Sequence, residues 1–308
     1  MAWLPADTDI DAELYYWAQA FERQVRGLRD DLELLVPEPQ HFNHIPTLTE
    51  LVKESTVSTE ALSSAGVAVS RNEGAAERLG IIDDLVDRFR KLAVMDFKFL
   101  YDTSRSLLTL GYDVGERRPD PSCYDLLASE ARLASFLLIA QGQVPQKHWF
   151  ALGRLLSRHG GNVSLISWSG SMFEYLMPQL FMPGYENTLL QQSCKAAVLR
   201  QIEYGRQRAV PWGISESCYN ATDVNQIYQY RAFGVPGLGF KRGLKDDLVI
   251  APYASALALT VMPQKACRNL QTMAANGFLG SYGFYEAIDY TPLRVPRDKN
   301  HIIVNTFM

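Results

Sequence analysis

Residues 211–220 read PWGISESCYN and place one carboxylate, Glu216, among aromatic, glycine and hydroxyl residues in a segment without helical or strand periodicity. A sugar ring offers apolar faces and hydroxyl edges, so aromatic side chains, hydrogen-bonding groups and an acid must converge on one concave surface to bind it. Trp212 and Tyr219 flank Glu216 closely enough to do so. The alternative is a loop between helices in which Glu216 is solvated or caps the next helix.

Glu130 is a second acid of interest, because it lies in a strongly apolar stretch. Ser122 is a suitable N-cap with Asp125 three positions later, which predicts a helix over residues 122–140. On that helix Glu130 projects from an apolar stripe, where a charge is costly. The position favours either an ion pair, for instance with Arg132, or a carboxyl group that opens onto a cavity and serves as a general acid.

The elements that must position these acids read as helices. A capping-box pattern at Thr8 and Asp11 precedes Leu14, Trp17 and Phe21, whose spacing of three and four residues predicts an amphipathic helix. No segment of useful length alternates with period two before residue 160, so a parallel sheet is not expected. The sequence therefore predicts a mainly helical, all-α fold.

Composition excludes several functions. The 308-residue chain, 47% hydrophobic and with a net charge of −4, has the character of a soluble protein without a basic surface for nucleic acid. It has no apolar run of about 20 residues and no signal-peptide pattern at its start, so we expect a cytoplasmic location. Four widely spaced cysteines and five histidines, of which only His41 and His44 are close, predict no disulfide framework and no metal site. No cofactor is expected.

Six blocks of sequence occur together in one order. They are residues 123–133, 148–149, 168–178, 212–220, 250–255 and 282–287. This set resembles the central, glycoamylase-like region of bacterial cyclic β-1,2-glucan synthases and, more distantly, endo-β-1,2-glucanases. The resemblance covers residues 80–308.

The resemblance implies an (α/α)6-barrel, a toroid of helix pairs whose central cavity binds β-1,2-linked glucan. Residues 1–75 would form a helical segment leading into the barrel, and residues 76–308 the barrel itself. The chain ends in an apolar run, residues 302–308, that lacks a helix C-cap. We therefore expect the barrel to be incomplete at its C-terminus.

In the synthases this region cyclises a glucan chain, which implies retaining transglycosylation. One carboxylate attacks the anomeric carbon, another protonates the leaving oxygen, and the far-end hydroxyl of the same chain then displaces the enzyme. The resemblance makes Glu216 the nucleophile and Glu130 the general acid/base, although the reverse assignment stays open. The candidates for holding glucose rings are aromatic or acidic: Trp168, Glu174, Trp212, Tyr219, Tyr253, Tyr285 and Glu286. In the alternative interpretation Trp168 anchors the core and Glu174 bonds the backbone of a tight turn. Arg231 and the Lys241-Arg242 pair are further ligand-facing candidates.

Two other functions remain open, an inverting endo-β-1,2-glucanase and a non-catalytic glucan-binding module. A separation of about 5 Å between the two carboxyl groups favours retention, and one well above about 6.5 Å favours inversion. The expected partners are β-1,2-glucan, as oligosaccharide or polysaccharide, and the remaining domains of a larger membrane-associated synthase. No membrane segment is predicted in this chain.

Overall fold

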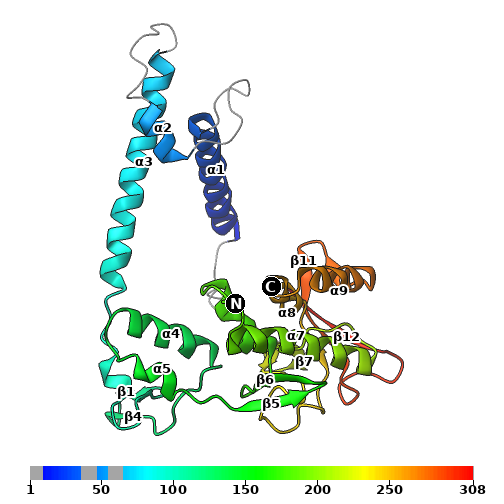
Figure 1. Ribbon diagram of the computed structural model, residues 1–308. Helices are drawn as coiled ribbons and strands as arrows, with labels where there is room; N and C mark the ends of the chain where they lie inside the picture. Colours follow the sequence, from blue (N-terminus) through cyan, green and yellow to red (C-terminus); the bar gives the residue numbers. More distant parts are fainter. Residues whose placement is uncertain (1–9, 36–46, 55–64, 308) are drawn as a thin grey trace. The chain divides into compact units, whose positions relative to one another are not determined.

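The computed structural model describes residues 10–35, 47–54 and 65–307, and its contacts divide the chain into two units, residues 1–95 and 96–308 (Figure 1). The first unit contains the helices α1 (Ile10–Leu35), α2 (Leu48–Glu54) and α3 (Ala65–Leu92). Helix α2 begins at Leu48 because Thr47 and Glu50 cap it reciprocally: the Thr47 amide donates to the Glu50 carboxylate and the Glu50 amide donates to Thr47 Oγ1.

The second unit opens with short antiparallel ladders and helices. A 3₁₀ turn, η1 (Lys98–Leu100), leads to the pairs β1 (Tyr101–Asp102) with β2 (Leu107–Leu108), and β3 (Tyr112–Asp113) with β4 (Arg118–Pro119). Helices α4 (Ser129–Ala140) and α5 (Lys147–Ala151) follow, and then the hairpin of β5 (Leu156–His159) and β6 (Asn162–Leu165). The turn of that hairpin contains Gly160 and Gly161, both at positive φ, where glycine is favoured.

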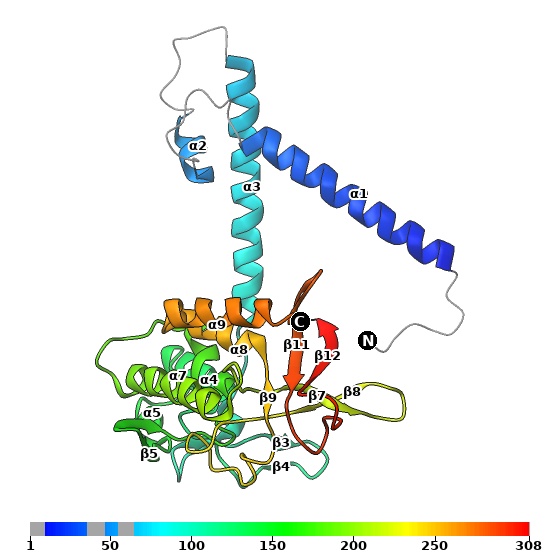
Figure 2. The same ribbon diagram turned by 90° about the vertical axis from the view of Figure 1, so that its right-hand side faces the viewer.

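The rest of this unit combines helices with a second set of strands. The helical elements are α6 (Met172–Leu176), η2 (Met177–Leu180), α7 (Leu189–Arg208), α8 (Pro252–Leu257), η3 (Ala258–Thr260) and α9 (Pro263–Ala275). The strands are β7 (Ser217–Thr222), β8 (Tyr228–Arg231), β9 (Val249–Ile250), β10 (Leu279–Gly280), β11 (Gly283–Asp289) and β12 (Ile302–Phe307). Strands β7 and β8 form a hairpin, and β11 pairs with β9, β10 and β12 in an antiparallel sheet (Figure 2).

The main hydrophobic core lies between α6, α7, α8, α9 and this sheet. Its largest fully buried members include Tyr175, Met172, Phe278 and Ile288. The Tyr175 hydroxyl donates to the backbone carbonyls of Leu165 and Leu238, so this polar atom is satisfied inside the core. Within the described ranges, no helix combines the length and hydrophobicity that crossing a bilayer requires.

The prediction of an all-α fold and an (α/α)6-barrel is wrong, because helices alternate with antiparallel strands throughout the second unit. Two properties of the strands hide them in the sequence. Most are only two to four residues long, too short to establish a period of two. In the longest, β11, residues 286–289 are all buried, so the alternation of apolar and polar residues is absent.

The apolar run at the end of the chain is also not an unfinished helix. Residues 302–307 form β12, in which Ile303 pairs with Ile288 and Ile302 with Asp289 of β11. The predicted division at residues 75 and 76 stays a prediction, while α3 runs without interruption from Ala65 to Leu92 across that position.

Two loops of the second unit are joined through their backbones. The Ser167 amide donates to the Leu238 carbonyl, and the Val235 amide donates to the Gly170 carbonyl. The approach is so close that a Cβ atom added at Gly234 would lie 1.7 Å from the Ser169 carbonyl oxygen. Only glycine fits at position 234 without moving one of the loops.

We expect Gly234→Ala to lower the free energy of unfolding by about 3 kcal/mol, because the added methyl group must displace backbone rather than a flexible side chain. Gly111→Ala is the matched control, since a Cβ atom there meets nothing within 4 Å. The control should change the stability by no more than about 0.5 kcal/mol. Urea denaturation of both variants measures the difference, and equal midpoints would contradict the close packing.

Candidate active site

The segment that carries Glu216 is fixed by a buried side-chain amide. Gln201, on α7 and only 1% exposed, accepts the Ile214 amide at 2.8 Å and donates to the Ile214 carbonyl at 2.7 Å. Both polar groups of this backbone unit are thereby satisfied away from water. The backbone of Ile214, two positions before Glu216, is therefore held by hydrogen bonds at both its amide and its carbonyl.

Trp212 anchors the start of the same segment in the core. The residue is 7% exposed and belongs to the main hydrophobic cluster. Asn269 of α9 accepts its amide at 3.3 Å and donates to its carbonyl at 2.7 Å, and Ser255 Oγ donates to that carbonyl at 3.0 Å. The indole ring is therefore part of the scaffold beneath the Glu216 segment, and a role in binding sugar stays a prediction.

Tyr253, on α8, contacts the segment directly at Glu216. Its hydroxyl lies 2.7 Å from Ser215 Oγ and 2.9 Å from the Glu216 carbonyl oxygen. Ser215 Oγ also accepts the Phe173 amide at 3.1 Å. Burial raises the pKa of Tyr253, and the nearby charges of Glu216 and Glu286 raise it further. The hydroxyl therefore stays protonated and acts as a donor at neutral pH.

The Glu216 side chain is half-buried and contacts a second tyrosine. The Tyr230 hydroxyl, on β8, donates to Glu216 Oε2 at 3.2 Å. Burial raises the pKa of Tyr230, and the charge of Glu216 and the hydrogen bond to it add to this shift. A neutral phenol thus donates a hydrogen bond to the carboxylate of Glu216.

Glu286, on β11, is a second carboxylate of this region. The residue is 9% exposed, and its Oε1 accepts the Cys218 amide of β7 at 3.0 Å. Its negative charge contributes to the raised pKa values of Tyr230 and Tyr253. The structure therefore gathers three of the predicted residues, Glu216, Tyr253 and Glu286, around Tyr230.

The carboxylate of Glu174 belongs to a different network. It accepts hydrogen bonds from the hydroxyls of Ser167, Ser169 and Ser171 and from the amides of Ser169 and Ser171. With Ser171 it forms the capping box of α6. This is the structural role that a glutamate at the third position of a helix commonly has, and a part in binding sugar stays a prediction.

The remaining aromatic candidates occupy different surroundings. Trp168 is 67% exposed, and Tyr285 is half-buried on β11. Tyr219 packs edge-on against Phe233, and the guanidinium of Arg294 lies 4.8 Å from the centre of its ring. Of these rings, Trp168 offers the most accessible face for stacking on a sugar.

Glu130 lies in the first turn of α4, although its side chain is outside the part of the structure that is described. The predicted helix over residues 122–140 is wrong at its start, because α4 begins only at Ser129. The Asp125 carboxylate accepts the amides of Leu127 and Ala128 and holds the preceding residues in a turn. Glu130 therefore lies at the second residue of α4 rather than near its middle, and its role as proton carrier stays a prediction.

The sequence interpretation missed Tyr230, Ser215, Gln201 and Asn269. Tyr230 sits in the alternating segment Tyr-Gln-Tyr-Arg opposite Cys218, a weak strand signal that follows the Glu216 segment after a turn. The signal that identifies Gln201 is a polar residue on the buried face of α7, at helical spacing from Ala197 and Tyr204. Among the residues that the structure describes, no group of three or more His, Cys, Asp or Glu side chains is arranged to hold a metal ion.

We expect Gln201→Met to lower the free energy of unfolding by about 2–4 kcal/mol, because it leaves the buried Ile214 amide without its acceptor and the Ile214 carbonyl with only the Met172 amide as donor. Gln207→Met on the same helix is the control, since Gln207 is exposed and its side-chain amide donates to the partly exposed Glu203 rather than to buried backbone. Chemical denaturation measures both variants. A Gln201→Met protein as stable as the control would show that the hydrogen bonds between Gln201 and Ile214 do not contribute to the stability of the fold.

Comparison with known proteins relates this site to a family. The glycoamylase family model, described as "Putative glucoamylase", matches residues 123–308. The chain is 48% identical over 224 residues to the cyclic beta-(1,2)-glucan synthase NdvB of Rhizobium meliloti (strain 1021), which is 72% of this chain and 8% of that protein. The chain thus spans less than a tenth of this curated relative.

Two solved structures are similar to the chain. One is a "putative glucoamylase" from Bacteroides caccae ATCC 43185, with 14% identity, a TM-score of 0.47 and coverage of 87% of this chain and 65% of that one. The other is a "putative glucoamylase" from Bacteroides fragilis NCTC 9343, with 13% identity, a TM-score of 0.42 and coverage of 86% and 64%. The family model matches well over half of the sequence and includes every predicted site residue, so the chain belongs to the glycoamylase family.

Proposed function

We propose that this chain acts on β-1,2-glucan by retaining transglycosylation, closing a linear chain into a ring. The observation that carries the proposal is the Glu216 carboxylate, which faces a neutral tyrosine within a segment matched by the glycoamylase family model. The similarity to a cyclic beta-(1,2)-glucan synthase supports β-1,2-glucan as the substrate. We further propose that residues 76–308 contain the catalytic part and that residues 1–75 lead into it.

In the proposed reaction Glu216 is the nucleophile. Its carboxylate attacks the anomeric carbon and forms a covalent glycosyl ester, while Glu130 gives a proton to the departing glycosidic oxygen. Glu130 then removes the proton from a 2-hydroxyl at the far end of the bound chain. That oxygen bonds to the anomeric carbon, and the Glu216 carboxylate is released.

The tyrosines give this mechanism a physical basis. Tyr230 donates to Oε2 of Glu216 and so helps to set the orientation of the attacking carboxylate. Tyr253 fixes the backbone carbonyl of the same residue, so the side chain starts from a defined position. Glu286 adds a negative charge near the site, which favours the positive charge that develops on the sugar in the transition state.

Incubation with linear β-1,2-glucan tests the proposal through its products. We expect cyclic glucan from the unmodified chain, and a loss of about 10²- to 10⁴-fold in rate for Glu216→Gln and for Glu130→Gln. Mass spectrometry distinguishes rings from chains, because a ring weighs one water less than a linear glucan with the same number of glucose units. Shorter reducing chains would indicate the hydrolase, and unchanged glucan with measurable binding would indicate a binding module.

Azide assigns the two roles, because a small anion can enter the space left by a missing carboxylate. In Glu216→Ala, azide attacks the β-linked carbon directly and should give an α-glycosyl azide. In Glu130→Ala, azide attacks the glycosyl ester of Glu216 and should give a β-glycosyl azide. NMR of the anomeric proton identifies each product, and the opposite pattern would exchange the two roles.

We expect Tyr230→Phe to lower kcat by about tenfold or more with a smaller change in KM, because the lost hydrogen bond positions the nucleophile rather than the bound chain. Tyr228→Phe, in the same strand, is the matched control and should keep the rate of the unmodified chain. Steady-state kinetics of ring formation measures both. If Tyr230→Phe formed rings at the rate of the unmodified chain, the proposed role of Tyr230 in positioning the nucleophile would be wrong.

A further inference from the structure

A cavity of about 340 Å³ lies beside β8, on the loop that follows it and on the turn after β11. Four cationic side chains line it, from Arg231, Lys241, Arg242 and Arg294, together with two acids, Asp246 and Asp247. The wall is therefore rich in positive charge within a chain whose net charge is −4. The volume lies in the range of small-molecule sites, about 300–1,000 Å³.

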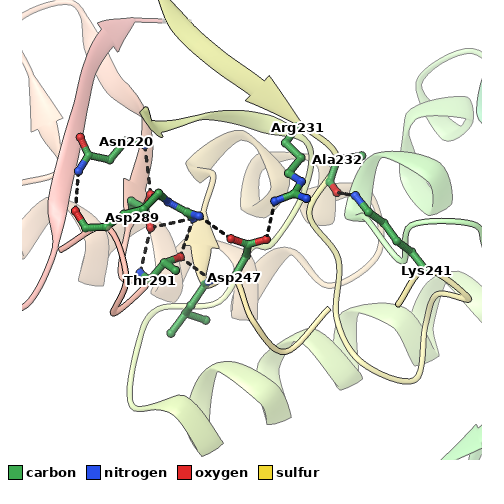
Figure 3. Close-up of polar contacts among 9 residues, drawn as sticks. Asn220, Arg231, Ala232, Lys241, Asp247, Asp289 and Thr291 are labelled. Atoms are coloured by element: carbon green, nitrogen blue, oxygen red, sulfur yellow. Dashed lines mark hydrogen bonds and ion pairs between the residues drawn. The ribbon is translucent and has the colours of Figure 1, made fainter. Parts of the chain in front are cut away.

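Two acids near this wall, Asp247 and Asp289, are already engaged in ion pairs. Asp247 Oδ1 pairs with Arg294 at 2.6 Å, and its Oδ2 pairs with Arg231 at 3.1 Å (Figure 3). Asp289, fully buried behind the wall, accepts Arg294 Nε at 2.7 Å and the amides of Asn220 and Thr291. These two carboxylates thus hold Arg294 and one side of Arg231, and their oxygens are not available to the other cations.

Lys241 lies in the same wall with a neutral partner. Its Nζ donates to the Ala232 carbonyl at 2.8 Å (Figure 3). Among the described residues neither Lys241 nor the exposed Arg242 forms an ion pair. Burial lowers the pKa of Lys241, and the charge of Arg231 lowers it further. An anion placed between these cations would relieve that repulsion.

We propose that this cavity binds a phosphoryl group, carried by free phosphate or by a phosphorylated sugar. Arg231 and Arg242 can each offer two parallel N–H donors, and Lys241 adds a compact charge from the neighbouring position. Such donors suit the oxygens of a tetrahedral dianion, whereas one arginine is enough for a planar carboxylate.

The cavity is distinct from the Glu216 site. Tyr230 and Arg231 are consecutive in β8, so their side chains leave opposite faces of the strand. Tyr230 contacts Glu216, and Arg231 contacts Asp247 in the cavity wall. Occupation of the cavity can therefore be measured without any glucan, and the outcome does not depend on the function proposed above.

Isothermal titration calorimetry of the full chain, at constant ionic strength and without glucan, tests the proposal with inorganic phosphate and with glucose 1-phosphate. We expect saturable binding of at least one probe, weakened about tenfold or more by Lys241→Gln and retained by Lys241→Arg. Tighter binding of glucose 1-phosphate would identify a phosphorylated sugar as the source, and equal or tighter binding of phosphate would identify the free anion.

Lys265→Gln is the control, because Lys265 is exposed on α9 and does not line the cavity. Arg242→Gln keeps the test valid if Lys241→Gln proves unstable, since the Arg242 side chain is exposed and should also contribute to binding. The proposal is overturned if neither probe shows saturable binding. It is equally overturned if folded Lys241→Gln or Arg242→Gln binds as tightly as Lys265→Gln.

Discussion

The arrangement of the second unit depends on a carboxylate that is completely removed from water. Asp289 is 0% exposed, and a charge in that position is tolerated only when its oxygens are satisfied. Arg294 pairs with it, and the amides of Asn220 and Thr291 donate to it. These bonds connect β7, β11 and the turn that follows, so loss of one partner would leave a buried charge and loosen three elements together.

Carboxylates that accept backbone amides also hold strand β7 in place. The hairpin that β7 forms with β8 is joined to β11 by side-chain acceptors, since Glu286 receives the Cys218 amide and Asp289 receives the Asn220 amide. Strand β7 starts directly after Glu216. The two acids of β11 therefore fix the strand that carries the proposed nucleophile segment, while Gln201 fixes the residues before it. Rigid support on both sides is what a reacting carboxylate requires.

One strand also links two environments of opposite character. On one face of β8, Tyr230 lies beside Glu216 and Glu286, and burial together with these negative charges raises the pKa of its phenol. At the next residue Arg231 enters a wall in which positive charges dominate. A period of two along the strand is enough to separate an acidic surface from a cationic one without any intervening element.

The sequence by itself determined the family, because the family depends on residue types and their order along the chain. It also indicated the Glu216 segment, Arg231 and Lys241 as candidates for contact with a ligand, and that indication stays a prediction. It did not determine that helices alternate with antiparallel strands, since short strands and a strand buried on both faces leave no period to read. Nor did it reveal that Glu286 supports β7 or that Asp289 accepts the Asn220 amide. Those roles depend on which hydrogen-bond donors the folded chain brings to each carboxylate, and only tertiary structure decides that.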